Sequence, residues 1–165
     1  AKADATTFFL TAAETQLLLA EAAERGGISG DAATIYKGAV ELAFDQLSQT
    51  GGNWSTAEAT AEADAYLAAN PYSSATGLQQ INEQYWAVVF MDEYEAFANL
   101  RRSGYPALTP VNYPNSAINT TGGTLPRRLM YPQHEASINS ASFNEAVQRM
   151  SDGNTMKSRV WWDVP

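Results

Sequence analysis

Apolar residues recur every three or four positions through most of the first two-thirds of the chain, which is the spacing of one face of an α-helix. The first such stretch begins near Ala13 and ends at Gly26-Gly27, where glycine permits the backbone turn that closes many helices. The same pattern, with its glycine and proline breaks, predicts helices over residues 12–25, 31–50, 56–69, 76–102 and 142–150.

Three of these predicted helices begin with a Ser or Thr that is followed three residues later by Glu. In this arrangement the hydroxyl and the carboxylate each accept a hydrogen bond from a backbone amide that the helix itself leaves unpaired. The pairs are Thr11 with Glu14, Ser55 with Glu58, and Ser142 with Glu145. Because the first two helices are joined by a short connection, we expect them to be antiparallel neighbours.

Residues 103–141 and 151–165 are expected to be irregular coil. Few helices tolerate the density of proline in the first of these segments, which contains Pro106, Pro110, Pro114, Pro126 and Pro132. A coil of this length tends to be packed or functional. We therefore predict a mainly α fold, in which tetratricopeptide-like antiparallel helix pairs pack against long, proline-rich coil within one domain over residues 1–165.

The charge balance and the absence of cysteine exclude several classes of function. Against 18 Asp and Glu there are 10 Lys and Arg, giving a net charge of −8, so nucleic acid is not an expected partner. Without cysteine the chain has no disulfide, thiolate nucleophile or thiolate metal site. No run of apolar residues reaches the roughly 18–20 needed to cross a bilayer.

The sequence offers no recognisable catalytic or metal-binding constellation. Its single histidine, His134, lies in the proline-rich segment, and Glu93 and Glu95 are too closely spaced to share one helix face. No catalytic residue, metal or cofactor is expected. The paired arginines Arg101-Arg102 and Arg127-Arg128 precede Tyr-Pro turns, and we interpret both pairs as structural, since arginine binds the free carbonyls at helix ends and stacks on tyrosine.

Aromatic residues in predicted loops are the candidate ligand-binding groups. Sugars have apolar C–H faces that stack on flat aromatic rings, while their hydroxyls pair with polar side chains. Trp54 follows Asn53, and Tyr72 and Tyr113 also lie in loops beside proline, where binding residues concentrate. The alternative interpretation is that each ring is buried against a helix, which is the commoner fate of Trp and Tyr.

Several motifs, taken in order, resemble the C-terminal third of the SusD/RagB family. They include R-R-S-G-Y-P, P-R-R-L-M-Y-P and W-W-D, and the resemblance is carried by residues 9–26, 81–86, 95–106, 125–135 and 160–163. It implies a mainly helical, tetratricopeptide-like scaffold. It also implies that the chain is the C-terminal fragment of a protein about three times longer, whose signal peptide and lipidated cysteine lie outside this sequence.

The resemblance further implies a function and a location. Members of the family are lipid-anchored on the outer face of the outer membrane in Bacteroidota. They bind glycans or peptides for import by a SusC-like TonB-dependent transporter, and they perform no chemistry. One alternative is a tetratricopeptide-like module that binds a peptide or partner protein, which an exposed groove of small and apolar residues would favour. Another is a fragment of an enzyme such as a glycoside hydrolase.

Overall fold

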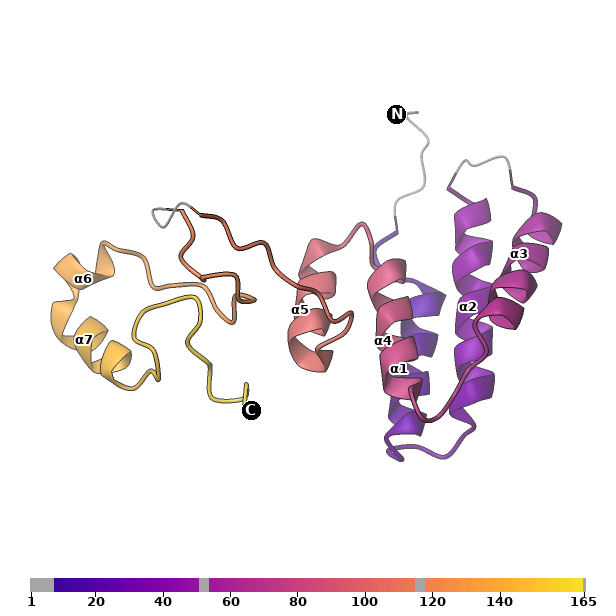
Figure 1. Ribbon diagram of the computed structural model, residues 1–165, viewed down its shortest axis with the longest axis horizontal. Coiled ribbons are helices and arrows are strands. Elements are labelled where there is room, and N and C mark those ends of the chain that lie inside the picture. The colour runs from indigo at the N-terminus through magenta and orange to yellow at the C-terminus, as the bar shows by residue number, and fades with distance from the viewer. Residues whose placement is uncertain (1–7, 51–53, 115–117, 165) are drawn as a thin grey trace. The chain divides into compact units, whose positions relative to one another are not determined.

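The computed structural model describes residues 8–50, 54–114 and 118–164. Contacts divide the chain into two compact units, Ala1–Pro106 and Ala107–Pro165, and each is described by itself. All regular secondary structure in the described residues is helical (Figure 1), which confirms the mainly α fold class. The described residues contain no helix that is long and apolar enough to cross a membrane.

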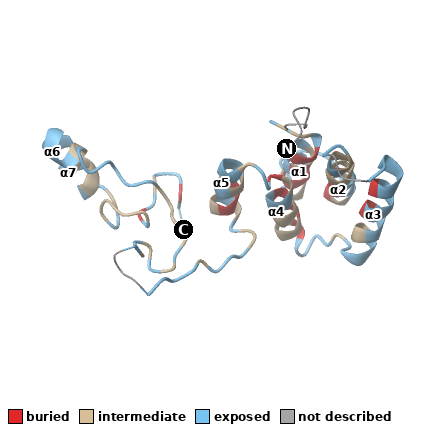
Figure 2. Ribbon diagram, turned by 90° about the horizontal axis from the view of Figure 1, so that it is seen from above, coloured by how far each residue is buried: buried red, intermediate tan, exposed pale blue. Residues whose placement is uncertain are grey.

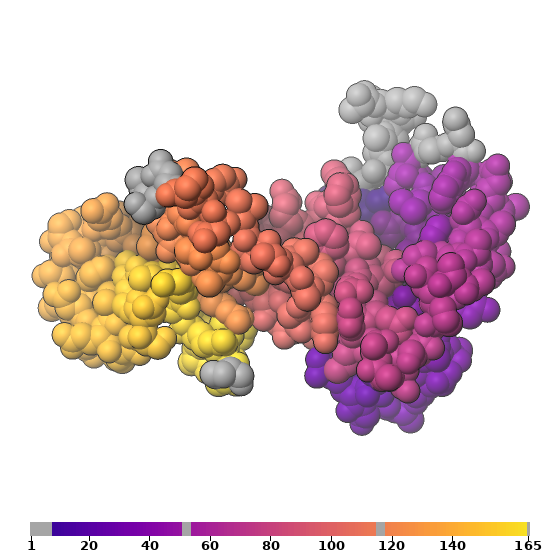
Figure 3. Space-filling model, viewed as in Figure 1, coloured from indigo at the N-terminus to yellow at the C-terminus, as the bar shows by residue number. Residues whose placement is uncertain are grey.

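The first unit contains five of the helices and the second unit two. In the first unit they are α1 (Ala12–Glu24), α2 (Ala32–Ser48), α3 (Thr56–Ala69), α4 (Gly77–Val88) and α5 (Glu93–Ser103). In the second unit they are α6 (Glu135–Ile138) and α7 (Ser140–Gln148). Helix α1 packs against α2 and α4, α3 lies along α2, and α5 contacts α4 (Figure 1). The space-filling view in Figure 3 shows the atoms of this unit closely packed on the visible face.

Two of the three predicted capping boxes are confirmed. The backbone amide of Thr11 donates to the Glu14 carboxylate at 2.7 Å, and the Glu14 amide donates to the Thr11 hydroxyl at 3.1 Å. Ser55 and Glu58 form the same reciprocal pair at the start of α3. These pairs satisfy amides that a helix start leaves free, so the sequence sets where α1 and α3 begin.

The core of the first unit is apolar and lies where α1, α2 and α4 meet. Figure 2 shows buried positions on the facing sides of these helices. The cluster consists of Leu17, Ala20, Tyr36, Ala39, Val40, Ile81, Tyr85 and Val89. The alanines in α1 and α2 allow close approach of the two helix axes, and the larger side chains from α2 and α4 fill the remaining space.

The prediction of one continuous helix over residues 76–102 is wrong. The segment forms two helices, because α4 ends at Val88 and α5 begins at Glu93. The side chain of Asp92 accepts a hydrogen bond from the Glu95 amide at 3.1 Å and so acts as the N-cap of α5. A capping aspartate favours a new helix start. The apolar pattern runs through this break without interruption, which is why the periodicity alone did not reveal it.

The prediction for the last helix was also wrong in detail. Helix α7 begins at Ser140, so Ser142 lies inside it, and Glu145 accepts a hydrogen bond from Arg149 at 3.0 Å instead of capping. The short helix α6 lies in a segment predicted as coil. No proline follows Pro132 until the last residue of the chain, so the backbone is free to form helical turns here.

The coil of the second unit is held by arginine contacts. Arg127 and Arg159 both donate to the Oδ1 atom of Asp163, at 3.2 Å and 2.8 Å, and Asp163 is buried. Arg128 donates to the side chain of Asn154 at 3.1 Å. The paired arginines at 127–128 therefore connect one stretch of coil to another far along the chain, which is the structural role that the sequence suggested.

Candidate functional site

Trp54 presents a half-exposed ring on a support of two further aromatic rings. Its indole lies nearly parallel to the Phe44 ring, with an interplanar angle of 3° and centroids 6.2 Å apart. The Phe44 ring in turn contacts Tyr66, at 5.9 Å and 46°. Trp54 is 42% exposed. The two rings are thus parallel but offset, and a large part of Trp54 is accessible to a ligand.

The support beneath Trp54 is fixed by contacts with the helices. Phe44, near the end of α2, and Tyr66, in α3, both pack against the core of the first unit. The Tyr66 hydroxyl donates to Gln84 of α4 at 2.9 Å. Sequence reasoning missed both rings as partners of Trp54. Their signal was weak, because Phe44 only continues the apolar face of α2 and nothing in the spacing indicates the stacking.

Tyr72 lies in the packing between helices. Its ring contacts Tyr36 at 5.2 Å, and its hydroxyl donates to Glu24 at 2.7 Å. Burial, together with the hydrogen bond to Glu24, raises the pKa of Tyr72 above its ordinary value. A side chain added at Gly77 would collide with the Tyr72 hydroxyl and the Glu24 carboxylate, which shows how closely the chain approaches here.

The other two predicted residues do not extend this site within the first unit. Tyr113 belongs to the second unit, where it is 56% exposed and its carbonyl accepts a hydrogen bond from Asn119 at 2.6 Å. Asn53 lies outside the described residues. No ring contact joins Trp54 to Tyr72 in the described part of the chain. The candidate platform is therefore Trp54 with its supporting rings.

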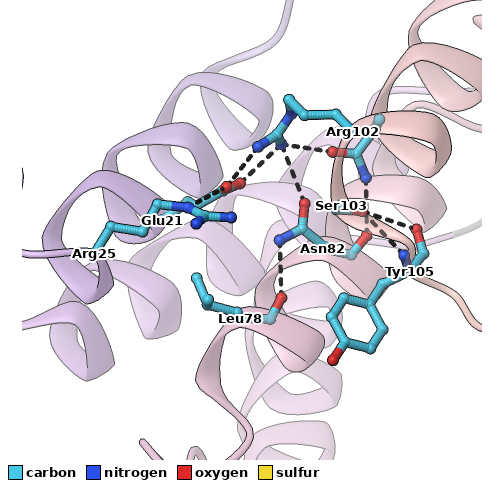
Figure 4. Close-up of polar contacts among 8 residues, drawn as sticks. Glu21, Arg25, Leu78, Asn82, Arg102, Ser103 and Tyr105 are labelled. Atoms are coloured by element: carbon cyan, nitrogen blue, oxygen red, sulfur yellow. Dashed lines mark hydrogen bonds and ion pairs between the residues drawn. The ribbon is translucent and has the colours of Figure 1, made fainter. Parts of the chain in front are cut away.

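The Arg101-Arg102 motif contributes to a polar network that holds α1, α4 and α5 together (Figure 4). Arg102 donates through both terminal nitrogens to the Glu21 carboxylate, with Nη2 at 2.8 Å from Oε2. It also donates to Asn82 at 3.2 Å and to Asn99 at 2.7 Å. One guanidinium therefore links side chains from three helices.

Contacts in and beside this network shift the pKa values of several side chains. Burial acts to raise the pKa of Glu21, but hydrogen bonds from Arg102 and Arg25 outweigh it and hold the pKa below its ordinary value. The hydrogen bond to Glu21 raises the pKa of Arg102. Burial raises the pKa of Tyr85 to about 12, and Glu95, which accepts from the Tyr85 hydroxyl at 3.3 Å, adds to this effect. Each of these shifts follows from contacts within the first unit.

The described residues contain no group of three or more His, Asp or Glu side chains that could hold a metal ion. His134 is exposed and lies 3.5 Å from the neighbouring Glu135. The carboxylate closest to Trp54 in sequence, Glu58, accepts from the Ser55 backbone amide and hydroxyl, both at 2.7 Å. These hydrogen bonds hold the pKa of Glu58 below its ordinary value, whereas a catalytic general acid needs a raised one.

A groove of about 410 Å³ lies on α2 and α3. It is lined by Gly38, Glu41, Leu42, Asp45 and Thr60. Two of these five residues are acidic, so the groove differs from the small and apolar surface that would favour a peptide-binding module.

Comparison with known proteins identifies what this chain is similar to. The family model "SusD-like: Susd and RagB outer membrane lipoprotein" matches residues 1–163. No curated protein matches the chain. Among solved structures, a chitin-binding protein is 43% identical over 93% of this chain and 33% of its own, with a TM-score of 0.77. A Bacteroidetes protein described as AC2a SusD-like is 35% identical over 94% of this chain and 30% of its own, with a TM-score of 0.79.

A chitin-binding SusD homologue from Flavobacterium johnsoniae is 27% identical over 92% of this chain and 36% of its own, with a TM-score of 0.68. The chain thus spans about a third of the length of these solved relatives. Because the family model covers nearly the whole sequence, this chain belongs to the SusD/RagB family of outer membrane lipoproteins.

Proposed function

We propose that this chain is part of a cell-surface protein that binds oligosaccharides for uptake and does not transform them. The observation that carries the proposal is the half-exposed indole of Trp54, supported in a nearly parallel stack by Phe44. Two solved relatives are described as chitin-binding. Oligomers of N-acetylglucosamine are therefore the first ligand class to test.

The rigidity of the Trp54 support favours binding. A ring that is already held in place loses little conformational freedom when a ligand stacks on it, so less of the interaction free energy is lost to ordering. Phe44 and Tyr66 provide this restraint, and the Ser55–Glu58 capping box fixes the backbone immediately after Trp54. The apolar face of a sugar ring would cover the exposed part of the indole.

The proposed partner is a SusC-like TonB-dependent transporter, with the protein held at the outer face of the outer membrane by a lipid anchor. The family description as an outer membrane lipoprotein supports this location. Co-purification of the native protein with a TonB-dependent transporter, together with its digestion by protease added to intact cells, is the expected result. Complete protection from protease in intact cells would contradict a surface location.

Calorimetric titration with the hexamer of N-acetylglucosamine tests the binding site. Trp54→Ala is expected to weaken binding about tenfold or more, since loss of about 1.4 kcal/mol of contact energy corresponds to a factor of ten. Trp86→Ala is a matched control, because Trp86 lies in the same unit and its exposed fraction, 38%, is similar to the 42% of Trp54. The control is expected to bind like the unchanged protein. Equal affinities for both variants would remove Trp54 from the site.

The non-catalytic part of the proposal has a separate test. Prolonged incubation of the protein with the hexamer should release no shorter oligomer and no new reducing end. Release of products that is lost on replacing Glu58 or another carboxylate would show hydrolysis, and the proposal of simple capture would then be wrong.

A further inference from the structure

We propose that a pocket on α6 and α7 is a second subsite, which binds one N-acetylated sugar unit through its acetamido group. The pocket has a volume of about 390 Å³ and lies wholly within the second unit. This inference rests on the proposed function, because it names the sugar chemistry that a further part of the same protein recognises. Small-molecule sites commonly measure about 300–1,000 Å³, so this pocket has room for a single sugar unit.

The lining of the pocket combines apolar and polar groups in a way that suits a sugar. Its apolar part includes Tyr131, Phe143 and Ala146, and its polar part Glu135, Asn139 and Ser142. Ligand sites generally pair an apolar wall with a few polar groups that fix orientation. The carboxylate of Glu135 would accept hydrogen bonds from sugar hydroxyls and repel an acidic sugar, so the pocket is suited to a neutral one.

Tyr131 is held rigidly although its side chain is 41% exposed. Its backbone amide donates to the Asn154 side chain at 2.8 Å, and its carbonyl accepts from the same side chain at 3.3 Å. The Arg128 guanidinium lies 4.8 Å from the centre of the Tyr131 ring. Phe143 contacts the ring edge-on, at 6.3 Å and 64°. The aromatic wall is thus fixed before a ligand arrives.

Two polar side chains in the pocket are not used by the fold. Asn139 is at the N-cap position of α7, yet its side chain makes no capping hydrogen bond. Ser142 has the sequence context of a capping residue but lies within α7. Neither side chain has a hydrogen-bond partner among the described residues. Both are therefore available to a ligand without breaking a contact that stabilises the fold.

The acetamido group matches these groups better than a plain hydroxyl does. It has one N–H donor, one carbonyl acceptor and an apolar methyl. The Asn139 amide can both donate and accept, and the Ser142 hydroxyl can do the same. Phe143 and Ala146 provide apolar contact for the methyl. A sugar with only a hydroxyl at that position would leave this apolar surface unfilled.

Two ligands of the same linkage test the inference. The hexamer of N-acetylglucosamine and the hexamer of glucose are both joined β-1,4, and they differ only in the acetamido group. We expect Asn139→Ala and Ser142→Ala each to weaken binding of the acetylated hexamer about fivefold, the loss of one or two hydrogen bonds. Binding of the glucose hexamer should change much less. Asn144→Ala is the control, since Asn144 lies on α7 outside the pocket lining.

The outcomes separate this inference from the proposed function. If Trp54→Ala weakens binding of the acetylated hexamer while Asn139→Ala and Ser142→Ala leave it unchanged, the second subsite is wrong and the proposed function stands. If neither ligand binds the unchanged protein, capture of these two oligosaccharides is wrong, and this inference is wrong with it. Both Asn139 and Ser142 are exposed, so their variants are expected to fold, which an unchanged circular dichroism spectrum checks. Equal losses for both hexamers would contradict recognition of the acetamido group.

Discussion

In the first unit the buried residues are mainly apolar and come from packed helices, whereas the second unit buries almost nothing. Among the described residues after Pro106, only Ser158 and Asp163 are buried, and both are polar. Figure 2 shows the same contrast, with buried positions concentrated in α1 to α5 and none in α6 or α7. One region is stabilised chiefly by the removal of apolar surface from water, and the other by hydrogen bonds and ion pairs.

This difference explains where each kind of substitution should act. Shortening an apolar side chain lowers the free energy of unfolding most where side chains fill a core, because a cavity remains. Removing a charged side chain lowers stability most where a buried carboxylate or a guanidinium joins distant segments, because its partner is then left unpaired. The following substitutions test this division, beginning with the largest expected effect.

Leu17→Ala should lower the free energy of unfolding by about 3–4 kcal/mol, as large-to-small changes in well-packed cores do. Leu17 is fully buried in the core cluster. Leu18→Ala, at the next position of α1, is the control because Leu18 is 46% exposed, and it should cost less than about 1 kcal/mol. Urea denaturation followed by circular dichroism measures both. Equal losses for the two variants would contradict an apolar core on this face of α1.

Arg102→Ala should lower the free energy of unfolding by about 3 kcal/mol. Breaking a buried ion pair costs about 3–5 kcal/mol, and we expect the low end of this range because Arg102 is itself half-exposed. The loss arises from Glu21, which is buried and, among the described residues, would keep Arg25 as its one charged partner. Arg149→Ala removes an exposed pair with Glu145 and should change stability by less than about 0.5 kcal/mol. A loss as small as the control's would show that the network in Figure 4 contributes little.

Asp163→Ala should lower the local stability of the coil in the second unit, since Arg127 and Arg159 both donate to this buried carboxylate. We expect about 2 kcal/mol of lost local stability, measured as faster hydrogen exchange of the Arg127 amide, which donates to the Met156 carbonyl at 2.7 Å. The amides of α1 should keep their exchange rates, because the partners of Asp163 belong to the second unit. Unchanged exchange at Arg127 would contradict the role assigned to this contact.

Stability should also depend on pH through Glu21. The folded protein holds the pKa of Glu21 below the ordinary value of 4.5, so its contribution is fully present above that pH and is lost as the pH falls through the folded-state pKa. Glu21→Gln should therefore flatten the acid limb of a plot of unfolding free energy against pH. The expected change is about 1.4 kcal/mol for every tenfold difference between the acid dissociation constants of the folded and unfolded states. Parallel curves for the two proteins would contradict this assignment.

The same division governs how much could be predicted from the sequence. Helices with an apolar face were predictable, and so were the starts of α1 and α3, because the capping boxes are local. The break before Asp92 was missed because the apolar face continues through it. In the second unit the contacts of Arg127 with Asp163 and of Arg128 with Asn154 join residues that are far apart, and no periodicity encodes such pairs.

The candidate site was predictable only in part, for a similar reason. Trp54 was identified from its place in a loop, but its stacking on Phe44 is a tertiary contact between residues ten positions apart, which local sequence does not reveal. Tyr72 has the same local sequence features, yet its hydroxyl is bound to Glu24. Local features can nominate an aromatic residue, but tertiary packing decides whether its ring faces solvent or a neighbouring helix.

The most direct test of oligosaccharide binding at Trp54 is a titration followed by the nuclear magnetic resonance signals of the tryptophan indoles. The chain contains four tryptophans, and single substitutions assign each indole N–H signal. On addition of the hexamer of N-acetylglucosamine, the Trp54 signal should shift and saturate while that of Trp86 stays in place. A shift at Trp86 without one at Trp54, or no shift at any indole at saturating ligand, would contradict the account.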